Sequence, residues 1–448
     1  MSAVRLKLAF FFISICLIIT GCASNNFPEN AFHGLNHIYQ SNGTTLNVVF
    51  VHGMGDHPFG EKGVLKYQMK IANALGFDED AVWETVDWGK HCTSNYGDYL
   101  KYSYFNKEEK QRIDVRRSAY QSVCPLRINE VIVGFIGWRQ YRSPSDNKIL
   151  NLFELSWDRA TELLQKTLLE LDGDYYETVE LDDLQMPIDG GVNRESDRAL
   201  INRWMKKFVN QNLGDPVIYL GDYGTSIRRV IADGLSSISA AADMDDNYEY
   251  SIISDSLGSR IIFDTLGCVL DLTDIDNPQI NSACDYINAD TELTDDRLED
   301  LKKMAHNTTQ VFMNANQLPL LALSNVRPPK KGEKENDWLN RFPCESGGPG
   351  LMMFLKKRDL THDPLQIVAF TDPNDVLSYH LTTRFKNKCT HLDQGRRKTV
   401  EFINVRLPNV KWTYFGLFAN PVKAHSTGFR SNDKAIDLLV NGYDADAQ

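Results

Sequence analysis

The sequence predicts an α/β protein built on a doubly wound, mostly parallel β-sheet. Strand-like and helix-like segments alternate along the chain, which is the pattern of parallel sheets whose helical crossovers cover both faces. Residues 45–51 form the continuous apolar run TLNVVFV, typical of a strand buried on both faces. The chain has 448 residues, 42% of them hydrophobic, which suffices for one large domain with insertions.

Composition and charge exclude several classes of protein. With 42% hydrophobic and 24% charged residues, the chain is neither collagen-like nor disordered. Its formal net charge is −12. An acidic body of this kind repels phosphate backbones, so we expect no nucleic-acid partner.

The N-terminus has the parts of a secretory signal. Two basic residues, Arg5 and Lys7, precede an apolar run over residues 8–19. That run is too short to span a bilayer core of about 30 Å. It continues into the sequence ITGC at residues 19–22, which resembles the bacterial lipobox.

The lipobox resemblance implies a lipid anchor. It makes residues 1–21 a signal peptide and Cys22 the site of lipid attachment, and the polar, Asn-rich residues 22–44 then suit a short tether. Because Ala23 rather than aspartate follows Cys22, the sorting pattern implies the outer membrane of a Gram-negative cell. We therefore expect a membrane-anchored protein of the bacterial envelope.

The domain itself is expected over residues 45–442. Further strands are predicted at 149–157, 248–254, 310–314, 365–370 and 400–405, and helices at 63–75, 159–171, 196–211, 226–241, 260–270 and 433–440. Insertions are expected near 90–148, 172–215 and 321–363. We expect one of them to cover the site as a lid.

The cysteine count suits an oxidising compartment. Apart from Cys16 and Cys22, six cysteines remain, and sequence alone allows 15 pairings of them. Pairing between sequence neighbours is favoured, and buried free thiols are the alternative. The favoured pairs are Cys92 with Cys124, Cys268 with Cys284, and Cys344 with Cys389.

A sharp turn between a strand and a helix carries the main chemical signal. The segment SDSLG at residues 254–258 follows a predicted strand and precedes the predicted helix at 260–270. Such a turn presents its central side chain, here Ser256, above a helix N-terminus. The segment resembles the nucleophile elbow of the α/β-hydrolase superfamily, with Gly258 in its expected place and Ser254 where glycine is usual. A helix-capping serine is the alternative interpretation.

The end of the first strand adds an independent signal. The segment HGMG at residues 52–55 resembles the superfamily loop that faces the oxyanion. The resemblance implies backbone donors at Met54 and Leu257. The alternatives are a glycine-rich turn or a metal site formed by His52, Asp56 and His57, although these have no ligand-type spacing. We expect no metal and no cofactor.

The same resemblance implies an acid after the next-to-last strand and a histidine after the last. Asp372 and Asp375 follow the strand at 365–370, and His425 follows the last strand. We favour Asp375 and keep Asp372 as the alternative acid. Two other histidines, His380 and His391, compete with His425 but lie earlier, beside the acid.

These four motifs predict an enzyme. Their order of serine, acid and histidine resembles that of the superfamily and implies a serine hydrolase acting on carboxylic esters, including acyl lipids. Thioesterase, acyltransferase and peptidase activities use the same triad. The alternatives of another kind are a metallohydrolase and a non-catalytic envelope lipoprotein that uses the fold as a binding module.

Overall fold

The structure is a computed structural model and describes part of the chain. The described residues are 28–41, 45–53, 62–77, 122–128, 131–143, 147–157, 161, 164, 214–242, 249–270, 284, 286–287, 293–325, 329–334, 348–357, 365–381, 400–408, 424–425 and 428–444. The expected signal peptide with Cys22 lies outside them, as do the expected helix at 196–211 and all of the expected insertion at 172–215 except residues 214–215.

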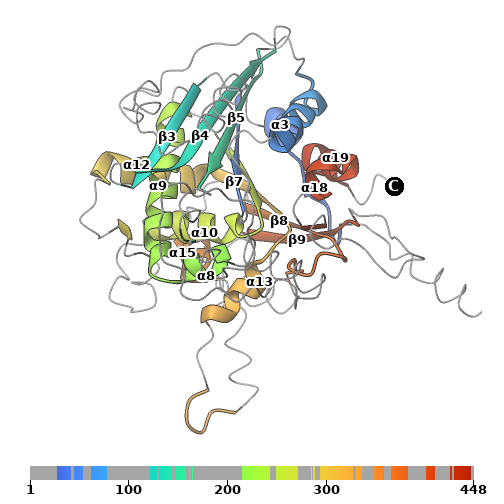
Figure 1. The fold of residues 1–448 in the computed structure, drawn as a ribbon. Helices are drawn as coiled ribbons and strands as arrows, with labels where there is room; N and C mark the ends of the chain where they lie inside the picture. The colour runs from blue at the N-terminus through green and yellow to red at the C-terminus, as the bar shows by residue number, and fades with distance from the viewer. Residues whose placement is uncertain are drawn as a thin grey trace, which may run out of the picture.

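An eight-stranded sheet forms the centre of the molecule (Figure 1). Its strands are β2 (Thr45–Val51), β3 (Ser122–Ile128), β4 (Val131–Arg142), β5 (Ile149–Ser156), β6 (Tyr250–Asp255), β7 (Thr308–Asn314), β8 (Leu365–Thr371) and β9 (Val400–Arg406). The spatial order is β3-β4-β5-β2-β6-β7-β8-β9. From β5 to β9 all neighbours are parallel, whereas β3 and β4 pair antiparallel at one edge. The α/β class and the mostly parallel sheet predicted from the sequence are therefore confirmed.

Helices cover both faces of this sheet (Figure 1). They are α2 (Asn36–Ser41), α3 (Lys62–Ala74), α8 (Gly214–Leu220), α9 (Tyr223–Ala242), α10 (Gly258–Leu270), α12 (Asp295–Asn307), α13 (Leu318–Leu321), the 3-10 helix η3 (Ala322–Asn325), α15 (Gly348–Lys357), α18 (Gly428–Ser431) and α19 (Asp433–Asn441). Side chains of α9, α10, α12 and α15 share one core, and those of α2, α3 and α19 share the other.

Strand β2 illustrates why the sheet is buried on both faces. Val49 and Val51 belong to the core on the α10 side, whereas Val48 and Phe50 belong to the core on the α3 side. Successive side chains of a strand point to opposite faces, so a strand covered on both sides needs an unbroken apolar run. The run predicted at 45–51 forms this strand with the expected bounds.

The expected insertion near 90–148 is corrected in its described part. Residues 122–142 form β3 and β4, which extend the main sheet instead of covering it. Their sequences hide this role, because Pro125 and Gly134 both disfavour strands. Pro125 is tolerated because β3 is the edge strand. At Gly134 a Cβ atom would lie 2.2 Å from the carbonyl oxygen of Ser156, so glycine is needed where β4 meets β5.

The expected tether over residues 22–44 is also corrected in its described part. Strand β1 (Phe32–His33) pairs antiparallel with β10 (Gly442–Tyr443) near the C-terminus. The backbone N–H of Leu35 donates to the carbonyl of Leu439 at 3.0 Å, and the Leu35 side chain is fully buried. The composition of this segment is polar, so the sequence alone does not show that it packs against the C-terminal elements.

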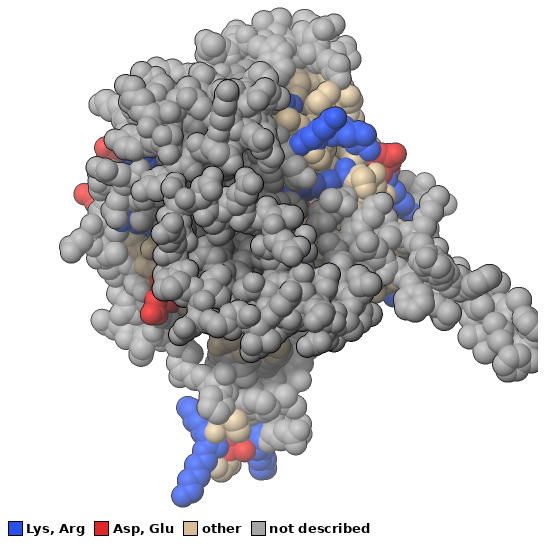
Figure 2. Space-filling model, viewed as in Figure 1, with Lys and Arg blue, Asp and Glu red and all other residues tan. Residues whose placement is uncertain are grey.

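The expected insertion near 321–363 contributes to the core as well. Helix α15 packs closely on α10, and its Leu351 and Phe354 are fully buried. By contrast, the lysine-rich segment 329–334 projects from the rest of the described structure (Figure 2). Its three lysines, Lys330, Lys331 and Lys334, are exposed.

One expected cysteine pair lies among the described residues. Cys268 and Cys284 form a disulfide with their Cα atoms 5.4 Å apart, which ties the end of α10 to the segment at 284–287. Cys124 is also disulfide-bonded, whereas Cys92, Cys344 and Cys389 lie outside the described residues. Within the described part of the chain, no helix is both long and apolar enough to cross a bilayer.

Candidate active site

The candidate site lies at the carboxyl ends of the parallel strands. From β2 the chain continues to β5 on one side and later returns to β6 on the other side of β2. The loops that follow β2 and β6 are therefore neighbours at a point where the winding of the sheet reverses. In open α/β sheets, ligands bind at such a point.

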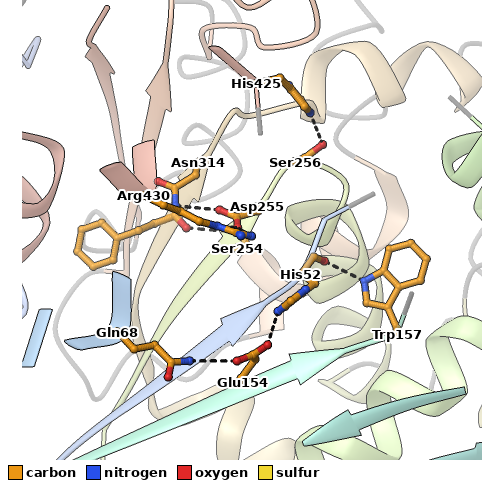
Figure 3. A network of polar contacts seen from close by, with 11 residues as sticks. His52, Gln68, Glu154, Trp157, Ser254, Asp255, Ser256, Asn314, His425 and Arg430 are labelled. Atoms are coloured by element: carbon orange, nitrogen blue, oxygen red, sulfur yellow. Dashed lines mark hydrogen bonds and ion pairs between the residues drawn. The ribbon is translucent and has the colours of Figure 1, made fainter. Parts of the chain in front are cut away.

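Ser256 occupies the turn between β6 and α10. Its φ angle is +52°, a left-handed conformation that non-glycine residues seldom adopt. The backbone is held there because the N–H of Ser256 donates to the carbonyl of Asn314 at 2.8 Å. Strained residues of this kind persist only where surrounding contacts fix them, and they concentrate at functional sites. The turn directs the Ser256 side chain toward His425 (Figure 3).

The two residues flanking this turn fit its close packing. A Cβ atom on Gly258 would lie 2.7 Å from the carbonyl oxygen of His52, so α10 can begin here only with glycine. Ser254, which stands where the hydrolase motif usually has glycine, is fully buried. Its hydroxyl lies 2.9 Å from that of Ser259, so the extra oxygen has a polar partner.

Three of the residues expected from the sequence lie together. The Nε2 atom of His425 lies 2.9 Å from Oγ of Ser256, and Nδ1 of His425 lies 2.8 Å from Oδ2 of Asp375. The side chains of His425 and Asp375 are 7% and 0% exposed. If Nδ1–H donates to the carboxylate, Nε2 carries a lone pair that accepts the Ser256 hydroxyl proton.

Comparisons of this chain with protein-family models, curated proteins and solved structures find no match. In this site the serine hydroxyl contacts an imidazole, and the imidazole contacts a buried carboxylate. Such an arrangement activates a serine oxygen as a nucleophile.

The geometry separates the two candidate acids. Oδ1 of Asp372 accepts hydrogen bonds from the backbone N–H and the side chain of Asn374, at 2.8 and 3.2 Å. Asp372 thus stabilises the turn after β8. Asp375 directs Oδ2 to His425, while its Oδ1 accepts the N–H of Leu377 at 2.9 Å.

The competing histidines differ in their positions. His380 lies 3.4 Å from the Thr371 hydroxyl through its Nδ1 atom, which places its ring at the end of β8. His391 lies outside the described residues.

One buried side chain of the site was missed by sequence reasoning. Nε2 of Gln317 lies 3.4 Å from Nε2 of His425, and Gln317 is 1% exposed. This glutamine follows β7, one strand beyond the nucleophile. No motif marks it, although its place after a central strand of the sheet is a signal that could have been used.

The backbone around Ser256 leaves a donor available. Among the described residues, no hydrogen bond is donated by the backbone N–H of Leu257. A Cβ atom on Gly53 would lie 2.5 Å from the carbonyl oxygen of Asp255 and 2.9 Å from Cβ of Ser256, so only glycine allows the loop after β2 to approach the nucleophile. Met54, the other expected donor, lies outside the described residues.

The His52 side chain turns away from Ser256 (Figure 3). Its Nε2 atom lies 2.8 Å from Oε1 of Glu154, and its backbone carbonyl accepts the indole N–H of Trp157 at 2.8 Å. Both members of the His52–Glu154 pair are buried. These contacts join the ends of β2 and β5 and fix the start of the loop that contains Gly53.

No metal site is found among the described residues, since no group of three His, Cys, Asp or Glu side chains gathers there. Asp56 and His57, named with His52 in the metal alternative, lie outside this part of the chain. His52 itself uses its Nε2 atom in the contact with Glu154.

Proposed function

We propose that this protein is a serine hydrolase of the α/β-hydrolase superfamily that cleaves carboxylic esters. The observation that supports it best is the unbroken series of contacts from Ser256 through His425 to Asp375. Its two links measure 2.9 and 2.8 Å, and the serine stands on a strained turn before a helix. Each residue is of the type that its role in ester cleavage requires.

The reaction then proceeds through an acyl-enzyme. Oγ of Ser256 attacks the ester carbonyl carbon while its proton passes to Nε2 of His425, and Asp375 stabilises the imidazolium. The negative charge on the carbonyl oxygen is held by backbone N–H groups, for which Leu257 and Met54 are our candidates. Collapse of this intermediate expels the alcohol, which takes the proton from His425. A water molecule then gives a proton to His425 and attacks the acyl-serine carbonyl carbon. Collapse of this second intermediate releases the carboxylic acid, and His425 returns the proton to Oγ of Ser256.

The chemistry can be tested with a fluorophosphonate probe, which reacts covalently with activated serines. We expect the full chain in detergent to be labelled at Ser256, as mapped by mass spectrometry, and labelling to be lost in His425→Ala because the serine then has no base. Ser324→Ala, a change at an exposed serine of η3, should label like the wild type. A folded wild-type protein that takes no label would contradict the proposal and favour a non-catalytic binding module.

We also propose that a lipid at Cys22 anchors the enzyme to the outer membrane, with acyl lipids as substrates. The support is the lipobox-like sequence at residues 19–22. A tethered site meets lipid esters at high local concentration.

A lid formed by an insertion would fit the low exposure of Ser256, which is 5%.

The anchor can be tested by metabolic labelling with a clickable fatty acid in a Gram-negative host. We expect the protein to incorporate the label and Cys22→Ala to incorporate none, because no thiol then remains at the lipidation position. Cys16→Ala, within the expected signal peptide, is the matched control and should be labelled normally. Equal incorporation in the Cys22→Ala protein would disprove lipidation at this residue.

A further inference from the structure

A partly buried ion pair connects the turn of Ser256 to the helix that follows His425 (Figure 3). Nε of Arg430 donates to Oδ2 of Asp255 at 3.0 Å, and its Nη2 donates to the same oxygen. Asp255 directly precedes Ser256, and Arg430 in α18 stands five residues after His425. The Arg430 and Asp255 side chains are 7% and 22% exposed. The pair therefore joins the segments that carry the nucleophile and its base.

The same carboxylate also engages the neighbouring strand. Oδ1 of Asp255 accepts from the side-chain amide of Asn314 at 2.9 Å, while the backbone carbonyl of Asn314 accepts the N–H of Ser256. Both oxygens of Asp255 are thus occupied by donors. Together these contacts hold the end of β6, the end of β7 and α18 in one arrangement.

We propose that Arg430 is a positioning residue, whose ion pair with Asp255 sets the distance between His425 and Ser256. This inference rests on the serine hydrolase function proposed above. The triad contacts between Ser256, His425 and Asp375 do not include Arg430, so its effect on His425 would be transmitted through α18.

Energetics favour a positional role over a stabilising one. Burying an ion pair costs desolvation energy that its attraction only partly returns, so such a pair is a poor source of stability. Two N–H groups of one planar guanidinium that converge on the same carboxylate oxygen restrict its direction as well as its distance. Catalysis is sensitive to the position of the reacting groups, since a misplacement of about 1 Å can slow a reaction about 100-fold.

The charge state of Asp255 agrees with a permanent pair. Burial by itself would raise the pKa of this carboxyl. The charge and hydrogen bonds of Arg430 act against burial, aided by the amide of Asn314 and the nearby His52. The net effect holds the pKa of Asp255 below its ordinary value. The carboxylate therefore stays ionised, and the pair stays formed, from neutral pH down into the acidic range.

Kinetics of Arg430→Gln test the proposal. We expect the rate of fluorophosphonate labelling and kcat for an ester such as p-nitrophenyl butyrate to fall about 100-fold, with KM nearly unchanged, because positioning acts on the reacting atoms. Arg430→Lys, which keeps the charge but loses the planar guanidinium, should restore part of the rate. Arg406→Gln, at an exposed arginine of β9, is the matched control and should match the wild type.

The pH profile separates positioning from a merely structural role. Without Arg430, burial becomes the dominant influence on Asp255 and raises its pKa. The groups that face this carboxylate would then be His52 after the end of β2, Asn314 of β7 and Tyr67 of α3. We expect an additional ionisation in the acid limb of kcat/KM for Arg430→Gln. It should be absent from the wild type and from the Asp255→Asn/Arg430→Gln double variant.

The double variant keeps the test decisive if Arg430→Gln does not fold, because it leaves no unpaired charge in the interior. We expect it to fold and to react slowly. Labelling at the wild-type rate in either folded variant would overturn the positioning role.

Crystal structures of the wild type and the double variant add a readout that needs no activity. We expect the distance from Oγ of Ser256 to Nε2 of His425 to exceed about 3.5 Å in the variant, beyond hydrogen-bonding range. An unchanged distance overturns the positioning role. Failure of the hydrolase function would appear separately, as a wild-type protein that keeps this contact but takes no label.

Discussion

Replacing Ser256 by alanine is expected to reduce kcat/KM for ester hydrolysis by about 10³- to 10⁶-fold, the range seen when a triad serine is removed. The loss should fall mainly on kcat, because the oxygen that bonds to the carbonyl carbon is gone while the surrounding surface is kept. Steady-state kinetics with p-nitrophenyl butyrate would measure both constants.

This variant should remain folded. The change removes one hydroxyl that contacts His425 and keeps the backbone bond from residue 256 to the carbonyl of Asn314, so we expect the free energy of unfolding to change by about 1 kcal/mol or less. Urea denaturation would measure it, with Ser324→Ala as the control. Ester hydrolysis that persists undiminished in folded Ser256→Ala would contradict the assignment of the nucleophile.

The largest effect on stability is expected from Gly267→Ala in the middle of α10. A Cβ atom there would lie 1.8 Å from the carbonyl oxygen of Gly350 in α15, a distance at which backbone must move. Conversely, a Cβ on Gly350 would lie 2.3 Å from Cα of Asp264. The two helices thus touch through their backbones. We expect the free energy of unfolding to fall by about 2 to 4 kcal/mol, as overpacking of a core does.

Helix propensity predicts the opposite sign, which makes this a sharp test. Alanine is favoured over glycine inside a helix by about 1 kcal/mol. Gly63→Ala, at an exposed position of α3, is the matched control and should leave stability equal or slightly increased. If Gly267→Ala were as stable as the wild type by urea denaturation, the close contact between α10 and α15 would be disproved.

The elements predicted most accurately from the sequence are those whose signal is local. The strand at 45–51 and the helix at 433–440 were predicted almost to their ends, because burial on both faces and amphipathic spacing are recorded in neighbouring residues. Helix α19 also has a local start signal, since the Asn432 side chain accepts the N–H of Lys434 at 3.0 Å. The turn at Ser256 also has a local signal, because small residues must flank it.

The acid illustrates the limit of such reasoning. Asp372 and Asp375 both follow β8 and are chemically identical, so composition could not separate them. What separates them is which carboxylate faces His425, some fifty residues later in the chain. Gln317, Glu154 and Arg430 escaped prediction for the same reason, since each acquires its role from a partner distant in sequence.

The sequence by itself therefore determined the α/β class, the central strands, the serine and the histidine that the structure brings together, and a pair of candidate acids. Only the tertiary structure decided that β3 and β4 extend the sheet, that residues 28–41 dock against the C-terminal elements, and that Asp375 rather than Asp372 contacts His425. The physical reason is that periodicity and turn chemistry depend on residues a few positions apart. Strand order, docking and side-chain contacts depend on which distant surfaces pack together, and so on the free energy of the whole chain.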